Sequence, residues 1–138
     1  MKITARADYA ILAIFELALH PPTTRVQARE LAESQEIPLR FLEQILIQLK
    51  KAGMVESVRG AAGGYKLACA PREISLARIM EAVEGDVTLL DSRVKPTCVL
   101  YKVWQEIDQE FVDKLGSITV EDLVRRKIRD DRVLVYHI

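Results

Sequence analysis

The chain has 138 residues, carries 20 basic and 20 acidic side chains, and is 49% hydrophobic. This length and composition favour a globular protein with one compact core, and two cysteines are too few for a secreted disulfide scaffold. No apolar run is long enough to span a bilayer and no signal-peptide pattern opens the chain, so we expect a cytoplasmic protein without membrane contact.

The first part of the chain predicts two helices. Thr4 can cap a helix that ends before Pro21, and its apolar residues recur along one side: Ala7, Ile11, Ile14, Phe15 and Ala18. Residues 26–34 predict a short second helix. The few residues at 34–37 then join it to a third helix, which is the connection that a helix-turn-helix needs.

The third helix is predicted between Pro38, which suits a first turn, and Gly53, which suits a left-handed stop. An apolar stripe at helical spacing should lie on the core: Leu42, Ile45, Leu46 and Leu49. Arg40, Glu43 and Gln44 then point away from the core. Such a face is often only solvated surface, but after a helix-turn it favours contact with DNA.

Residues 54–58 and 65–68 predict two short strands joined by RGAAGG. The glycines Gly60, Gly63 and Gly64 let backbone approach a phosphate, and Arg59 on a thin loop can enter a narrow minor groove. Alone these glycines would indicate an ordinary hairpin. After two helices of a helix-turn-helix, they indicate a wing.

The second half of the chain predicts support and assembly. Ser75 caps a predicted helix that stops at Gly85, Thr119 caps a short helix, and VLVYHI at 133–138 has the pattern of a strand. Between them, Thr97 opens a long helix to about residue 115. Its apolar residues either fold back on the chain's own core or pair with a second copy: Leu100, Trp104, Ile107, Phe111 and Leu115.

Several of these stretches resemble the Rrf2 family of bacterial winged-helix regulators. They are MKITARADYAILAIFELA at 1–18, LRFLEQIL at 39–46, AGMVESVRGAAGGYKLA at 52–68, ITVEDLV at 118–124, and Trp104 in the long helix. The resemblance covers nearly the whole chain. It implies a homodimer whose two recognition helices enter successive major grooves.

The expected fold is mainly α with a small β-hairpin wing (α+β). We divide the chain into a winged helix-turn-helix domain over 1–85, a connecting loop over 86–97, a dimerisation helix over 98–116, and a C-terminal helix and tail over 117–138 that packs on the core or on the dimer partner.

The chemistry of the predicted DNA-reading residues suggests their roles. Arg40 can donate to guanine, Glu43 can accept from cytosine, and Gln44 can pair with adenine or a phosphate. Leu39 and Phe41 would touch thymine methyls or position the helix. Phosphate contacts, which set register without reading sequence, are expected from three arginines: Arg6, Arg25 and Arg29.

What the regulator senses is a separate question. Many family members hold an iron-sulfur cluster through three cysteines before the long helix, and Cys98 matches only the last of them. Tyr101 stands where one branch has a histidine ligand, although Asp8 matches an acidic ligand of another branch. One thiolate cannot build a four-cysteine site, so we expect no conventional cluster and no metal site; an iron-sulfur sensor that uses Cys98 is the alternative.

Cys98 has two further interpretations. Its place near a helix N-terminus could make it a reactive thiol switch, or it packs as a small apolar side chain.

The cysteine-poor branch of the family suggests another way of sensing, because this chain resembles that branch in ending with an aromatic-rich tail that closes with Ile138. The tail could enter O-acetylserine sulfhydrylase through its terminal carboxylate, or form an edge strand on its own dimer.

No Ser/His/Asp set and no phosphate-loop pattern is present, so a catalytic role has little support. We expect a sequence-specific transcriptional repressor that binds double-stranded DNA as a homodimer on a palindromic operator, responding to sulfur, cysteine or redox status. An alternative of another class is a winged-helix adaptor for proteins, which would show apolar anchors where Arg40, Glu43 and Gln44 stand.

Overall fold

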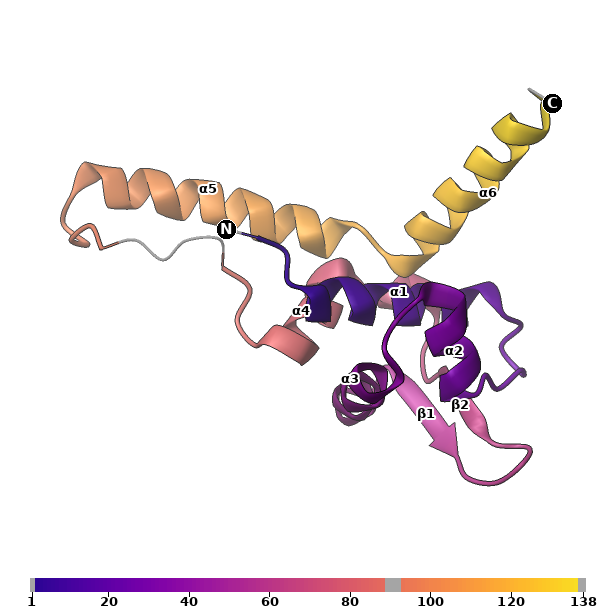
Figure 1. Ribbon diagram of the computed structural model, residues 1–138. Coiled ribbons are helices and arrows are strands. Elements are labelled where there is room, and N and C mark those ends of the chain that lie inside the picture. Colours follow the sequence, from indigo (N-terminus) through magenta and orange to yellow (C-terminus); the bar gives the residue numbers. More distant parts are fainter. Residues whose placement is uncertain (1, 89–92, 137–138) are drawn as a thin grey trace.

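The computed structural model describes residues 2–88 and 93–136 (Figure 1). Within them the chain forms six α-helices, one short 3-10 helix and a two-stranded antiparallel sheet. In chain order the elements are α1 (Ala5–Leu19), α2 (Ala28–Gln35), α3 (Leu39–Lys51), β1 (Val55–Val58), β2 (Gly64–Leu67), η1 (Pro71–Glu73), α4 (Leu76–Glu84), α5 (Val99–Ser117) and α6 (Val120–Tyr136). The expected fold, mainly α with a β-hairpin wing, is confirmed.

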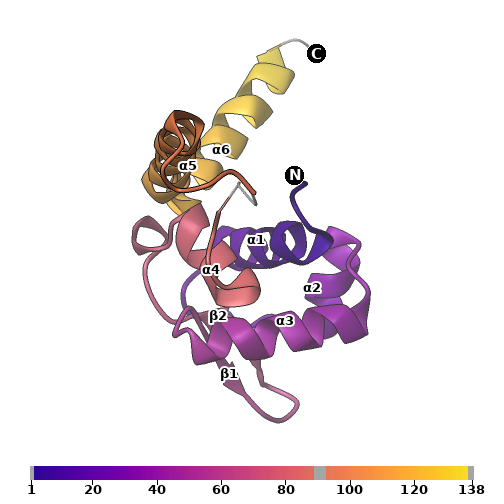
Figure 2. The ribbon, with the colours of Figure 1, turned by 90° about the vertical axis from the view of Figure 1, so that its left-hand side faces the viewer.

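One core is formed between α1, α3 and α4, with α2 closing one end (Figure 2). The predicted stripe of α3 is buried in full: Leu42, Ile45, Leu46 and Leu49. The face predicted for α1 is displaced, because the buried residues there are Ala7, Ala10, Ala13, Ile14 and Leu17. Alanines let α1 approach its neighbours closely, whereas Ile11 and Phe15 lie at the edge, in a groove beside α6.

The predicted helix caps within residues 1–85 are confirmed. The backbone N–H of Ala7 donates to the Thr4 hydroxyl over 3.1 Å, and that of Arg78 donates to the Ser75 hydroxyl over 3.1 Å. Each bond satisfies a donor that a helix start leaves without a partner. Gly53 follows α3 with a φ of 79°, the left-handed conformation expected of it.

Backbone hydrogen bonding holds the turn between α2 and α3. Glu36 adopts a left-handed φ of 54°, and the N–H of Ile37 donates to the carbonyl of Ala32 over 2.9 Å. The Ile37 side chain is buried, which anchors the turn in the core. Helix α2 begins two residues later than predicted because Val26 is extended and exchanges two 2.8 Å backbone bonds with Tyr65 of β2.

The C-terminal prediction was partly wrong. A strand was expected at 133–138, but α6 continues as a helix to Tyr136; His137 and Ile138 lie outside the described residues. Strand propensity is overridden here because a lone strand leaves its backbone groups unpaired, whereas a helix satisfies them internally. Ion pairs at i,i+4 spacing, Arg125–Glu121 among them, also favour the helix.

Helix α6 starts with a reciprocal cap. The N–H of Thr119 donates to the Asp122 carboxylate over 2.9 Å, and the N–H of Asp122 donates to the Thr119 hydroxyl over 3.1 Å. The bond from the Thr119 backbone, followed by that from its hydroxyl, lowers the pKa of the Asp122 carboxyl. The predicted Thr119 cap is therefore confirmed, although the helix it opens is long.

The long helix α5 begins at Val99, with Cys98 as its cap residue, and passes through Gly116 instead of ending there. It lies over α1 and α4, and α6 projects away from it (Figure 1). Two 2.9 Å backbone bonds fix the junction between α5 and α6: Leu76 N–H to the Ile118 carbonyl, and Val120 N–H to the Ile74 carbonyl. The C-terminal helices are thereby attached to the start of α4.

Candidate nucleic-acid interface

The outer face of α3 carries polar and charged side chains. Arg40, Glu43 and Gln44 are exposed there, as predicted. The same face also exposes Ile47 and Lys50, two residues that the sequence analysis did not single out. Helical spacing identifies Ile47 as a member of this face, because Ile47 follows Arg40 by seven residues and so returns to the same side of the helix.

Leu39 and Phe41, which were expected to touch thymine methyls or to position the helix, lie at the edge of the core. The Phe41 ring is partly buried and meets the Tyr9 ring edge to face, with 5.5 Å between centroids. The Arg6 guanidinium lies 5.6 Å from the centre of the same ring and donates to the Gln48 side chain over 3.3 Å. Leu39 is also partly buried and borders a shallow hollow beside α2. Phe41 therefore holds α1 against α3.

Four arginines remain available around this face: Arg25, Arg29, Arg40 and Arg59. They are exposed, and among the described residues none of them enters an ion pair with a carboxylate. Arg25 precedes the strand-like Val26, and Arg29 lies in the first turn of α2. Guanidinium groups without carboxylate partners keep their charge available for phosphates.

The wing is built by close backbone contacts at two of its glycines. A Cβ atom on Gly63 would collide with the carbonyl oxygen of Val58 across the loop. Gly64 has a φ of 137°, and a Cβ there would lie 2.7 Å from the Val26 carbonyl oxygen. Both glycines are buried, so they serve the folding of the hairpin, whereas Gly60, with a φ of 105°, is exposed beside Arg59.

Side chains join the wing to the helices. Gln27 donates to the Gly63 carbonyl over 2.9 Å, and the Lys50 ammonium group donates to the Ser57 hydroxyl of β1 over 2.6 Å. Between α3 and the wing lies an open groove of about 400 Å³, bordered by both elements and by the start of α2. The wing and the outer face of α3 are therefore held at a fixed spacing.

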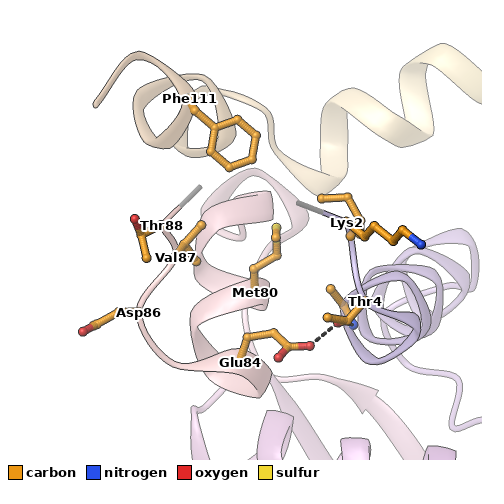
Figure 3. A pocket seen from close by; sticks show the side chains of 10 residues that line it. Lys2, Thr4, Met80, Glu84, Asp86, Val87, Thr88 and Phe111 are labelled. Atoms are coloured by element: carbon orange, nitrogen blue, oxygen red, sulfur yellow. Dashed lines mark hydrogen bonds between the residues drawn. The ribbon is translucent and has the colours of Figure 1, made fainter. Parts of the chain in front are cut away.

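A second hollow lies on the opposite side of the domain, between the start of α1, the end of α4 and α5 (Figure 3). Its volume is about 350 Å³, and Phe111 of α5 points toward Met80 of α4 across it. At its edge the Thr4 hydroxyl donates to the Glu84 carboxylate. This hollow separates α5 from the DNA-binding half and is no part of the α3 face.

The cysteines do not converge on a cluster site. Cys98 stands at the start of α5, while Cys69 follows β2, and the start of α5 lies far from the hairpin (Figure 1). The Cys69 sulfur lies 3.6 Å from the Arg78 guanidinium, and Asp8 is exposed in the first turn of α1. Within the described residues no three His, Cys, Asp or Glu side chains gather as a metal site.

A helix-turn-helix followed by an antiparallel hairpin with an exposed arginine defines a winged helix-turn-helix DNA-binding protein. Within the described ranges, no helix has the length and apolar character that crossing a bilayer requires.

Comparisons identify the family. The model of the Rrf2 family, described as an iron-dependent transcriptional regulator, matches residues 3–126. A helix-turn-helix transcriptional regulator of Synechocystis sp. is 39% identical over 128 residues, which cover 89% of this chain and 87% of that protein. IscR of Vibrio vulnificus is 33% identical over 130 residues, covering 90% of this chain and 77% of that protein.

Solved structures agree with this assignment. IscR of T. potens superposes with a TM-score of 0.78 and 35% identity over 92% of this chain and 88% of that one. CymR, the global cysteine regulator of B. subtilis, superposes with a TM-score of 0.82 and 29% identity over 91% of this chain and 98% of that one. The chain belongs to the Rrf2 family and is a transcriptional regulator, not an enzyme.

The glycine contacts in the wing generate a prediction about stability. Gly63→Ala should lower the free energy of unfolding by about 1–3 kcal/mol, because the new Cβ must displace the Val58 backbone. Gly116→Ala is the matched control: space around Gly116 is open, so alanine within α5 should be neutral or stabilise by about 0.5–1 kcal/mol. Urea unfolding followed by circular dichroism measures both, and a Gly63→Ala protein as stable as its parent would refute the contact.

Proposed function

We propose that the protein acts in the cytoplasm as a homodimeric repressor, with α3 in the major groove and the wing in the adjacent minor groove of a palindromic operator. The observation that carries the proposal is the exposed α3 face of Arg40, Glu43 and Gln44, beside which arginines stand without carboxylate partners. Arg40 donates to guanine, Glu43 accepts from cytosine, and Gln44 pairs with adenine or a phosphate.

The positions of the other arginines suggest which parts of the DNA they contact. Arg59 enters the minor groove, where a narrow width concentrates negative potential. Arg25 and Arg29 bind phosphates, while Arg6, held by Phe41 and Gln48, can reach only the backbone at the flank of α3. Two such surfaces related by a two-fold axis require half-sites about 34 Å apart, or a multiple of that spacing.

A protein-binding adaptor is a weaker explanation of the same surface. Protein interfaces are enriched in aromatic residues at their centre and depleted of charged ones. Here Arg40, Glu43 and Lys50 are exposed on one helix face, and the nearby aromatic Phe41 is turned into the core edge. The charged surface favours nucleic acid.

The wing assignment is tested on an operator obtained by selecting bound fragments of genomic DNA with the purified protein. Arg59→Ala should weaken binding to that operator roughly tenfold, because one arginine contact in a groove contributes about 1–3 kcal/mol. The control Arg72→Ala removes an equally exposed arginine from η1, away from α3 and the wing, and should bind as the parent does. Unchanged affinity of Arg59→Ala, measured by fluorescence anisotropy, would contradict the wing assignment.

Dimerisation through α5 is supported by its uncovered apolar stripe. None of the α5 side chains is buried in the protomer. Of the predicted dimerisation residues, Leu100 and Ile107 are exposed, whereas Trp104, Phe111 and Leu115 are partly covered. Val103 is exposed on the same side of the helix. A second copy packed along this stripe removes the apolar surface from water.

The exposed apolar stripe of α5 predicts that a charged side chain placed within it disrupts dimerisation. Ile107→Glu should convert the dimer to a monomer and weaken operator binding, because a buried carboxylate without a partner opposes association. Val99→Glu is the control, since Val99 is 77% exposed at the start of α5 and points away from the centre of the stripe. Light scattering after size-exclusion chromatography gives the molar mass; a dimeric Ile107→Glu protein would overturn this interface.

For the signal, we propose regulation without a conventional iron-sulfur cluster, in response to sulfur, cysteine or redox status. One cysteine in the cluster region, Cys98, supports the first part, and similarity to a cysteine regulator supports the second. A thiol switch at Cys98, which is half-buried at the start of α5, is the alternative. Docking of Ile138 into O-acetylserine sulfhydrylase stays a prediction.

Two measurements test these signals. Protein purified without oxygen should contain no iron, and stoichiometric iron with sulfide would refute the cluster-free regulator.

O-acetylserine sulfhydrylase should bind the full chain and not a chain lacking Ile138; equal binding to both, or to neither, would refute the tail hypothesis.

A further inference from the structure

An isoleucine stands in the middle of the polar face of α3. The Ile47 side chain is 54% exposed, although α3 buries four other aliphatic residues completely. Successive helix residues turn by about 100°, so Glu43 and Lys51 lie within about 40° of Ile47 on either side, and Arg40 lies within about 20°. One apolar side chain therefore stands within the charged surface assigned to DNA.

The core does not account for Ile47. Its neighbours Leu46 and Leu49 are already buried, and Ile47 borders the open groove between α3 and the wing. β-Branched residues are also poorer helix formers than the lysine, glutamine or glutamate that surround it, so nothing local favours isoleucine at an exposed helix position. An apolar side chain in this place gains free energy only when another apolar group covers it.

The major groove offers one apolar group on natural bases, the C5-methyl of thymine. We propose that Ile47 contacts a thymine C5-methyl in each half-site and is a specificity-determining residue of this regulator. The inference rests on the proposed function, which places the α3 face in the major groove. It adds an apolar reading position to the polar ones at Arg40, Glu43 and Gln44.

Helix geometry limits where the thymine lies. Ile47 is one turn beyond Glu43, which is a rise of about 6 Å at 1.5 Å per residue. Consecutive base pairs are about 3.4 Å apart along the duplex. The thymine is therefore one or two base steps from the base that Glu43 contacts, within the same half-site.

The contact is tested by removing the methyl group from DNA alone. Each thymine of the selected operator is replaced in turn by deoxyuridine, which differs only in lacking the C5-methyl, and affinity is measured by fluorescence anisotropy. Burying one methyl group contributes about 0.8 kcal/mol, so replacement at the proposed position should weaken binding about fourfold in one half-site and about fifteenfold in both.

Variants of Ile47 test the same contact from the protein side. Ile47→Ala should bind thymine and deoxyuridine operators equally at that position, and Ile47→Val should keep part of the difference. Ile3→Ala is the matched control, because Ile3 is 51% exposed on the opposite side of the domain, and it should retain the full fourfold effect. Thermal unfolding verifies that each variant is folded.

The outcomes separate this inference from the proposed function. Failure of the parent protein to bind any DNA fragment would refute the proposed function itself. If the parent binds but no thymine replacement weakens it, Ile47 reads no methyl group. If Ile47→Ala loses affinity yet keeps the full response to deoxyuridine at every position, Ile47 does not contact the methyl and the inference is overturned.

Discussion

Burial of one stripe of α3 determines what this protein presents to DNA. Leu42, Ile45, Leu46 and Leu49 are each worth about 2 kcal/mol when removed from water, and together they fix the rotation of the helix about its axis. Once that rotation is fixed, the residues of the opposite side face solvent. The polar groups and the isoleucine of that side are therefore oriented mainly by the burial of the opposite side.

The wing depends on the same core through the backbone. Val26, between α1 and α2, pairs with Tyr65 of β2, and this pairing brings the Val26 carbonyl so close to Gly64 that a side chain is excluded. Lys50 adds a bond from the end of α3 to β1. Because the hairpin is attached through both of its strands, the arginine of the wing and the outer face of α3 belong to one continuous surface.

The C-terminal helices contact α1 and α4, and backbone hydrogen bonds attach them at their junction. The backbone bonds between residues 74–76 and 118–120 join the α5–α6 junction to the start of α4, while a hollow separates Phe111 of α5 from α1 and α4 farther along. In the dimer that we propose, this junction helps to set the spacing of the two α3 helices.

The sequence by itself determined the local elements, because helix caps, helix-ending glycines and apolar spacing depend on interactions between residues that are close in the chain. Thr4, Ser75 and Gly53 marked helix ends correctly, and the stripe of α3 was recognised in full. Tertiary structure decided two other features: Phe41 turned into the core edge, and two wing glycines proved to be packing positions. Both depend on segments distant in the chain coming together, which no pattern of adjacent residues indicates. The helical tail at 133–136 has a local cause, because a helix satisfies its own backbone groups where a lone strand does not.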